Sequence, residues 1–475
     1  MRKFLISALT ITLLGAALLT PAYLRYRQNA GVVPPGVRLA GMELNGASQA
    51  EVAAGLNRSF EEPVSVYYGD LRIILRPQMV GFQVDVAAML AEAQAHNTPF
   101  NLVRVLVGEA LDRPPAPVDV PLRYNLNRDA VDNWLADVAS RYDRPPLPPQ
   151  PILATLSIAP GQPGQQLDLT ASRERVIAAL TDPQTRSANL IFRETAPPPV
   201  NMAALGELLQ ARVEQFPGIA SVFLHDIPTG EEIAIDADVA YAGMSTLKII
   251  IVSEVYRKLD APPDAEVSRL ISETMAVSGN FTANLLLGVI DDGDPNEGVR
   301  ILNTSLHKLG LRNSFMATPY DRKLPTPPHV VTEANSRTDL DTQPDPYMQT
   351  TPRDIGLMLT MLVECSRGGG TLLAAYEKQY TPAECQQALD YMSLNEVTAL
   401  LTSGAPEDAR VIHKHGYVAD THGDVAAIRG PAGPYVLSVF LYRPTWLEWE
   451  ISDTTMRELS QAAWNYFEMV SGEQQ

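Results

Sequence analysis

Residues 241–252 read Tyr241-Ala242-Gly243-Met244-Ser245-Thr246-Leu247-Lys248-Ile249-Ile250-Ile251-Val252. The apolar run after Lys248 predicts a buried helix that begins near Ser245. At a spacing of three residues, Lys248 lies one turn further along the same helix face as Ser245. An amine held there without water has a lowered pKa and can take the serine proton, while N–H groups at the helix start can stabilise an oxyanion. The segment therefore predicts a nucleophilic serine with a lysine base.

The rest of the chain decides whether this Ser-x-x-Lys pattern carries chemistry. Two further triplets follow it in order, Ser278-Gly279-Asn280 and Lys414-His415-Gly416. Ser278 can relay a proton to a leaving nitrogen, and Lys414 can hold that hydroxyl and attract a substrate carboxylate. Gly416 allows substrate backbone to lie close to its strand. Together the three elements favour a serine–lysine acyl-transfer site.

A second Ser-x-x-Lys copy, Ser305-Leu306-His307-Lys308, competes for this role. Its later partners would be Ser393-Leu394-Asn395 and the same Lys414. We reject this set, because Ser305 does not open an apolar helix and Ser393 is predicted to lie in the middle of a helix over 391–401.

From about Pro217 onward the chain resembles class A β-lactamases and their penicillin-binding relatives. Besides the three motifs, Thr350-Thr351-Pro352-Arg353-Asp354 is similar to the segment that follows the active-site loop of that family. The resemblance implies an α+β domain over 201–475: an antiparallel sheet flanked by helices, plus a helical lobe, with the site between them. Predicted hairpins (221–235 and 425–442) and a final helix (452–470) fit this order.

The resemblance also implies roles for the matching residues. It implies an acyl-enzyme on Ser245, with β-lactams hydrolysed as substrates and no cofactor. In the same comparison, Lys248 is the base, Ser278 and Lys414 form the proton relay and carboxylate site, and the Ser245 and Tyr417 N–H groups form the oxyanion hole. The substrate-binding residues would be Asn280, His415, Gly416 and Tyr417.

Two departures from the family pattern put the substrate and the fate of the acyl-enzyme in doubt. Class A enzymes carry Glu-x-x-Leu-Asn shortly before the Thr-Thr-Pro segment, and its glutamate directs the deacylating water. Residues 321–349 lack this pattern and contain one glutamate, Glu333, which is either the base or a solvated loop residue. His415 stands where the family has a hydroxyl residue. It either donates to a carboxylate when protonated or narrows the site.

Three nearby histidines, His413, His415 and His422, raise the alternative of a zinc site. Since the strand that carries two of them already serves the serine site, we expect no metal.

The region before the hydrolase-like domain carries no catalytic pattern. It lies between proline-rich breaks at 113–117, 144–149 and 196–199, which predict extended connectors. A hairpin is predicted over 64–75, and an extended segment followed by a helix recurs at 76–96 and 159–180. The stretches 36–46 and 80–85 resemble the peptidoglycan-binding domains found before VanW-type and transpeptidase domains. That resemblance implies two small α+β halves, 36–112 and 118–197, that bind the cell wall.

The N-terminus predicts export. Met1-Arg2-Lys3 is basic, and residues 4–24 contain no charge, which is long enough for a transmembrane helix. Thr20-Pro21-Ala22 could instead be the cleavage site of a signal peptide over 1–28. We favour an uncleaved membrane anchor, and both alternatives place the chain outside the cytoplasm. Export permits a Cys365–Cys385 disulfide, with two buried free thiols as the alternative.

The amino-acid composition and net charge limit the kinds of partner that the chain can bind. Hydrophobic residues make up 45% of the 475 residues, which is normal for a globular protein. The net charge of −18 disfavours nucleic-acid binding. We therefore expect a monomer that contacts the wall and the membrane and acts on β-lactams or peptidoglycan stem peptides. The alternatives are a penicillin-binding D-Ala-D-Ala peptidase-like enzyme and a non-catalytic wall-binding protein.

Overall fold

The computed structural model describes residues 20, 24, 31–44, 47–110, 112–113 and 116–473. They form two compact units: the residues up to Leu147 with 163–197, and 148–162 with the residues from Pro198 onward. The segment 148–162, which lies inside the predicted half 118–197, packs with the second unit. The predicted anchor or signal peptide at 1–28 falls almost wholly outside the described residues. Within the described ranges, we find no helix with the length and hydropathy needed to cross a bilayer.

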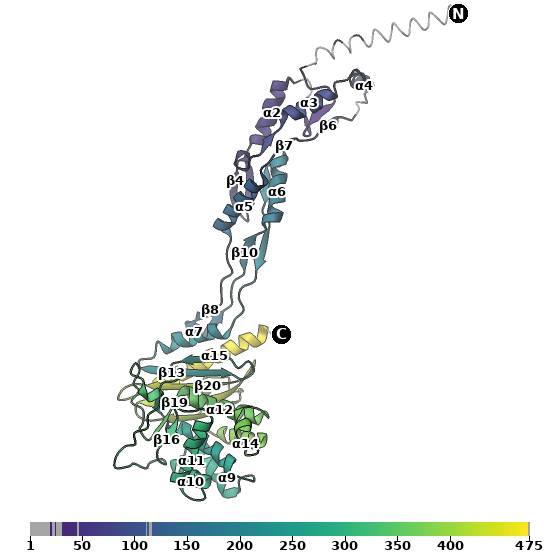
Figure 1. Ribbon diagram of the computed structural model, residues 1–475. Coiled ribbons are helices and arrows are strands. Elements are labelled where there is room, and N and C mark those ends of the chain that lie inside the picture. The colour runs from purple at the N-terminus through teal and green to yellow at the C-terminus, as the bar shows by residue number, and fades with distance from the viewer. Residues whose placement is uncertain are drawn as a thin grey trace, which may run out of the picture. The chain divides into compact units, whose positions relative to one another are not determined.

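The first unit is built from short strands and amphipathic helices around one apolar core (Figure 1). Its sheets have the orders β2-β1-β6, β11-β3-β4, β10-β12 and β5-β7. The predicted hairpin is present as β3 and β4. The strands are β1 (Val37–Leu39), β2 (Met42–Glu43), β3 (Val64–Tyr68), β4 (Leu71–Leu75), β5 (Gln83–Val84), β6 (Val118–Val120), β7 (Tyr124–Asn125), β10 (Gly164–Leu167), β11 (Ser187–Asn189) and β12 (Phe192–Thr195). The helices are α2 (Gln49–Glu61), α3 (Val86–Ala95), α4 (Pro99–Ala110), α5 (Arg128–Tyr142) and α6 (Leu169–Thr181).

The recurring strand-then-helix phrase has a local cause. Asp85 follows β5 and accepts a hydrogen bond from Ala88 N–H, which caps α3. Asp168 follows β10 and caps α6 in the same way through Ala171 N–H. An aspartate at this position satisfies one of the unpaired donors at a helix start, so both phrases turn from strand to helix at the aspartate.

The second unit contains one five-stranded antiparallel sheet in the order β14-β13-β20-β19-β18. The hairpins predicted at 221–235 and 425–442 are present as β13–β14 and β19–β20. The predicted α+β class and the antiparallel sheet are thus confirmed. The sheet strands are β13 (Ile219–Asp226), β14 (Glu232–Ile235), β18 (Val411–Tyr417), β19 (Thr421–Gly430) and β20 (Gly433–Tyr442).

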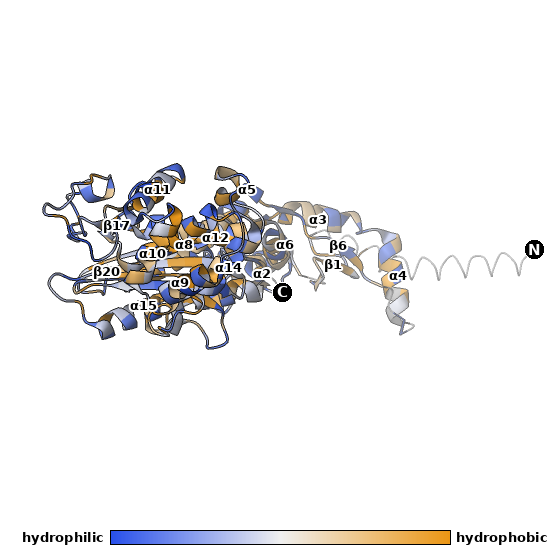
Figure 2. Cartoon of the chain, turned by 90° about the horizontal axis from the view of Figure 1, so that it is seen from below, coloured by the Kyte–Doolittle hydropathy of each residue, from blue (hydrophilic) through white to orange (hydrophobic). Residues whose placement is uncertain are grey.

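Alternation along the central strand explains why helices cover both faces of this sheet. Leu437, Val439 and Leu441 of β20 pack in the core beneath α7 (Met202–Val213) and α15 (Trp449–Glu473). Val436 and Phe440 point to the opposite core, which contains α8 (Lys248–Lys258) and α12 (Pro352–Ser366). Successive side chains of a strand point to opposite faces, so a strand buried on both faces is apolar throughout. Figure 2 shows this apolar colour on β20 and α8.

The remaining elements of the unit form the helical lobe and a small three-stranded sheet, β15-β17-β16. The hairpin of residues 148–162, β8 with β9, packs against α7 and α15. These elements are β8 (Gln150–Ile152), β9 (Ser157–Ala159), β15 (Tyr241–Ala242), β16 (Phe315–Met316), β17 (Met348–Thr350), α9 (Ala265–Ala276), α10 (Asn280–Ile290), α11 (Pro295–Lys308), α13 (Thr371–Ala375) and α14 (Pro382–Met392).

One predicted helix is absent from the structure. The helix over 391–401 does not exist, because α14 ends at Met392 and Ser393 is its C-cap. Asn395 leaves the helical path and donates its side-chain amide to His413 O at 3.2 Å. The competing serine is still unsuited to catalysis, since Ser305 is buried and its hydroxyl contacts Glu254 and Tyr376.

The two cysteines form a disulfide between α12 and α14, so the disulfide alternative is confirmed. Both residues are buried in the core that contains α8 and α12. The bond closes a loop of 20 residues that includes α13. It therefore restricts the unfolded chain and stabilises the lobe that faces the sheet.

We expect removal of this disulfide to destabilise the second unit. By loop-closure entropy, a loop of this length is worth about 3 kcal/mol. Cys365→Ala/Cys385→Ala should therefore unfold at a clearly lower denaturant midpoint than the oxidised wild type. Wild-type protein unfolded in reductant is the matched control, since it lacks the bond but keeps both side chains. An unchanged midpoint in both samples would contradict the expectation.

Candidate active site

Ser245 lies at the start of α8, but on a tighter turn than predicted. Residues 244–247 form a 3₁₀ helix that runs directly into α8. Met244 has φ +50°, which is unusual for a residue with a side chain. Its carbonyl oxygen accepts a 2.7 Å hydrogen bond from the hydroxyl of the buried Tyr320. This contact holds the strained residue immediately before Ser245.

Lys248 is buried and hydrogen-bonded to residues of the first two motifs. Its Nζ donates to Ser245 Oγ at 2.7 Å, to Ser278 O at 2.9 Å and to Asn280 Oδ1 at 2.8 Å. The ring of Tyr320 lies 4.5 Å from the same atom. The serine and the lysine predicted from the three-residue spacing are therefore in hydrogen-bond contact.

The protonation of Lys248 is set by its surroundings. Burial lowers its pKa to about 7, helped by the positive charge of Lys414 and opposed by the carboxylate of Asp321. Near neutral pH a large fraction of this amine is therefore uncharged. An uncharged amine 2.7 Å from a hydroxyl can accept its proton.

Ser278 joins the two lysines. Its Oγ accepts hydrogen bonds from Lys414 Nζ at 3.0 Å and from Lys248 Nζ at 3.3 Å. Ser278 has φ +60°, so its backbone is also held in an uncommon conformation. Burial lowers the pKa of Lys414 to about 8, against the attraction of Asp424. The hydroxyl thus lies between two amines that can pass protons through it.

Gly416 allows β18 to approach the serine. A Cβ atom at this position would lie 2.7 Å from the backbone nitrogen of Ser245 and 2.8 Å from Cβ of Met244. No side chain fits there without moving the strand away from Ser245. The next residue, Tyr417, is 60% exposed and borders the space beside the serine.

His415 is held as a neutral ring. Burial and the charge of Lys414 lower its pKa to about 4. Asn395 Nδ2 lies 3.2 Å from its Nδ1 and, having only hydrogens to offer, makes that nitrogen the acceptor. Nε2 therefore carries the ring hydrogen. Of the two predicted roles, donation by a protonated ring does not fit near neutral pH.

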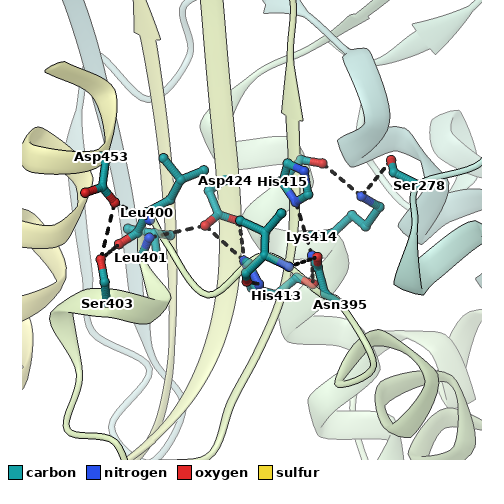
Figure 3. Close-up of polar contacts among 11 residues, drawn as sticks. Ser278, Asn395, Leu400, Leu401, Ser403, His413, Lys414, His415, Asp424 and Asp453 are labelled. Carbon is teal, nitrogen blue, oxygen red and sulfur yellow. Dashed lines mark hydrogen bonds and ion pairs between the residues drawn. The ribbon is translucent and has the colours of Figure 1, made fainter. Parts of the chain in front are cut away.

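His413, two residues earlier on β18, has the opposite character and points to Asp424, whereas Lys414 points to Ser278 (Figure 3). Its Nδ1 lies 3.0 Å from Oδ1 of the buried Asp424, and its Nε2 lies 2.9 Å from Val397 O. Burial works against the charged ring, but the charge and hydrogen bond of Asp424 outweigh it and raise the pKa of His413. The pair ties β18 to β19 and to the segment after α14.

The zinc alternative finds no support in this arrangement. His422 Nδ1 contacts Ser452 Oγ at 2.6 Å, so the three histidines have three separate partners. Across the described ranges, no three His, Cys, Asp or Glu side chains are grouped so that they could hold a metal ion.

Asp321 is a site residue that the sequence analysis missed. Asn280 Nδ2 donates to both of its carboxylate oxygens at 3.2 Å, while Asn280 Oδ1 accepts from Lys248. The search for a base considered glutamates, and Asp321 stands in Thr318-Pro319-Tyr320-Asp321 with no recognised pattern. The only indication in the sequence is that Asp321 is the first residue of the stretch 321–349, in which class A enzymes would carry their glutamate base.

Glu333, the predicted candidate base, is not brought to this site. It is exposed beside the short turn 334–336. It borders neither of the two cavities that reach Ser245. No hydrogen bond links it to the site residues, so its placement matches a solvated loop residue.

Two cavities open beside Ser245. One, of about 240 Å³, is bordered by Ser245, Asn280, Tyr320, Asp321, Asp345 and Tyr417, among others. The other, of about 840 Å³, is bordered by Ser245, Ser278, Asn280, His415, Gly416, Tyr417 and Trp449, among others. Ser245 and Asn280 thus border both cavities.

Two parts of the chain match models of known protein families. Residues 258–467 match the model of the "Beta-lactamase enzyme family", and residues 73–188 match that of the "Putative peptidoglycan binding domain". Both resemblances predicted from the motifs are thereby confirmed. The first match begins after Ser245 and Lys248, so the assignment of these two residues rests on their geometry. No curated protein matches the chain.

Solved structures of low identity cover a little over half of the chain. The "Structure of PBP-A" is 19% identical, covers 57% of this chain and 99% of its own, and has a TM-score of 0.44. An ancestral class A β-lactamase of Gram-negative bacteria is 23% identical, with coverages of 55% and 98% and a TM-score of 0.41. A β-lactamase from Streptosporangium roseum is 19% identical, with coverages of 55% and 97% and a TM-score of 0.42.

The electrostatic contacts of Lys248 predict two opposite shifts. Lys414→Met removes a positive neighbour and should raise the pKa of Lys248, whereas Asp321→Asn removes a negative one and should lower it. NMR titration of protein labelled at lysine Cε would measure both, since the chain has only seven lysines. Shifts of the same sign in both variants would contradict this account of the site.

Proposed function

We propose that the second unit is a serine hydrolase of the β-lactamase type. β-Lactams acylate its Ser245, and the resulting acyl-enzyme is then hydrolysed. The observation that carries the proposal is the 2.7 Å contact between Ser245 Oγ and the amine of a buried Lys248 whose pKa lies near 7. A hydroxyl next to an amine that is partly neutral at working pH is an activated nucleophile.

Each neighbouring group has a role in the acylation step. Lys248 takes the Ser245 proton as Oγ attacks the lactam carbonyl, and the Ser245 and Tyr417 N–H groups bind the oxyanion. As the C–N bond breaks, Ser278 gives its proton to the leaving nitrogen and is reprotonated from the lysines beside it. The charge of Lys414 and the Nε2–H of His415 hold the substrate carboxylate.

The Asn280 side chain would bind the amide group of the substrate. Its Nδ2 carries two hydrogens, of which Asp321 takes at least one. The first unit would bind peptidoglycan, in keeping with the family model that it matches. We further propose that the chain acts outside the cytoplasm, on the support of its apolar N-terminus and its disulfide.

A second candidate function is a penicillin-binding, peptidase-like activity on D-Ala-D-Ala stem peptides. The specific observation in its favour is the missing Glu-x-x-Leu-Asn pattern, together with the placement of Glu333 away from Ser245. An enzyme without a base for water would keep its acyl group for hours.

The first test is intact-mass analysis of the full chain with benzylpenicillin. We expect one penicilloyl adduct on the wild type and none on Ser245→Ala. Lys248→Ala should lose the adduct, whereas Lys308→Ala, which removes the lysine of the other Ser-x-x-Lys, should keep it. An adduct that decays supports hydrolysis, and one that persists supports the peptidase-like candidate. With no adduct on the wild type, a non-catalytic wall-binding protein would be the better description.

The rate of acylation should depend on pH with a maximum between about pH 7 and pH 8. It rises as Lys248 loses its proton around pH 7 and falls as Lys414 loses the charge that holds the carboxylate around pH 8. His415 is neutral across this range. The carboxylate of Asp321, in the loop after β16, acts on Lys248 by raising its pKa. Stopped-flow acylation would give the profile. The methyl ester of benzylpenicillin, which lacks the carboxylate, should lose the falling limb; a falling limb that persists with the ester would contradict the role of Lys414.

A further inference from the structure

The turn that carries Asp321 is held rigidly in the second unit. Thr318 Oγ1 donates to Arg322 O at 2.9 Å and closes the turn. Tyr320 N–H donates to Asn284 Oδ1 at 2.8 Å, and Asn284 Nδ2 donates to Tyr320 O at 3.0 Å. These bonds fix the backbone on both sides of Tyr320 and so fix the position of Asp321, which follows it.

The same turn is fastened to the nucleophile segment. The Tyr320 hydroxyl bonds to Met244 O, one residue before Ser245, and its ring contacts the Lys248 amine. Tyr320 is buried, whereas Asp321 is exposed and borders the smaller cavity together with Ser245. The buried ring therefore fixes the position of the exposed carboxylate relative to the serine.

Asp321 itself has a strained backbone, with φ +61°. Such conformations cost free energy and persist where the surroundings enforce them, often at functional sites. Here the strain places the carboxylate on Asn280 Nδ2, the amide that also contacts Lys248. One amide thus links this carboxylate to the lysine that contacts the nucleophile.

We propose that Asp321 is the general base that directs water onto the acyl-enzyme, in the place of the missing glutamate. This inference rests on the proposed acylation of Ser245. A water molecule in the smaller cavity gives a proton to the Asp321 carboxylate as its oxygen bonds to the ester carbonyl carbon. The tetrahedral intermediate then breaks its bond to Ser245 Oγ, which takes a proton from Lys248, itself protonated from solvent after acylation. The acid product leaves, Asp321 returns its proton to solvent, and Lys248 is again neutral.

Two other carboxylates of the stretch 321–349 fit this role less well. Asp345 borders the same cavity, but its Oδ1 accepts the Tyr347 N–H at 2.8 Å and caps a turn. Glu333 borders neither cavity. These two residues supply matched control variants, since each changes one carboxylate in the same stretch of chain.

The test separates acylation from deacylation in Asp321→Asn. The asparagine Oδ1 can still accept from Asn280 Nδ2, so the variant keeps the positioning bond; it loses the base and lowers the pKa of Lys248, which acylation tolerates. We expect its penicilloyl adduct to form at a rate within about tenfold of wild type and to decay about 100-fold or more slowly, the usual size of general-base catalysis. Pulse-chase intact-mass measurement gives both rates. Asp345→Asn and Glu333→Gln should decay like the wild type.

A second variant distinguishes catalysis from positioning. Asp321→Ala leaves space for a small carboxylate, so added formate should restore part of the decay rate, which a purely structural role would not allow. Decay of Asp321→Asn at the wild-type rate, or a wild-type adduct that itself persists for hours, would overturn the inference and leave acylation of Ser245 standing. Absence of any adduct on the wild type would overturn the proposed function and this inference together.

Discussion

Two lysine amines, Lys248 and Lys414, are buried around the hydroxyl of Ser278, and the chemistry of the site depends on their burial. Neither has a carboxylate in direct contact, since Asp424 pairs with His413 and Asp321 bonds to Asn280. Burial favours the uncharged amine at both lysines, and at Lys248 the positive charge of Lys414 adds to it, which is why both pKa values fall toward neutrality. An ordinary surface lysine would stay protonated and could not act as a base.

The position of Lys414 depends in turn on how β18 is held at the sheet edge. Its side chain and that of His413 lie on successive residues, so they point to opposite sides of the strand. The His413–Asp424 pair anchors one side within the fold, while Gly416 brings the other side against the Ser245 backbone. Asn395 bonds to both His413 O and the His415 ring, so the same segment sets the strand and the histidine tautomer.

At three residues around the nucleophile the backbone is strained, which costs stability but positions functional groups of the second unit. Met244, Ser278 and Asp321 all have positive φ, and each adjoins or contributes a group around the nucleophile. The buried Tyr320 supports two of these positions, through its hydroxyl on Met244 and its peptide link to Asp321. Packing in the core between the sheet and α8 thus compensates for strain at the site.

The sequence by itself determined the elements whose causes are local. The three-residue spacing of Ser245 and Lys248 places both on one helix face. The alternation of apolar residues in β13, β14, β19 and β20 favours hairpins. Asp85 and Asp168 cap the helices that follow them. The order of the three motifs was also enough to bring Ser278 and Lys414 into the predicted site. Only tertiary structure decided the rest. Asp321, Asn395 and Asp424 belong to segments with no pattern of their own. Asp321 is positioned by the buried Tyr320, Asn395 by the end of α14 at Met392, and Asp424 by the register of β19 against β18. Contacts between residues far apart in the chain leave no periodic signal, so local patterns cannot predict them.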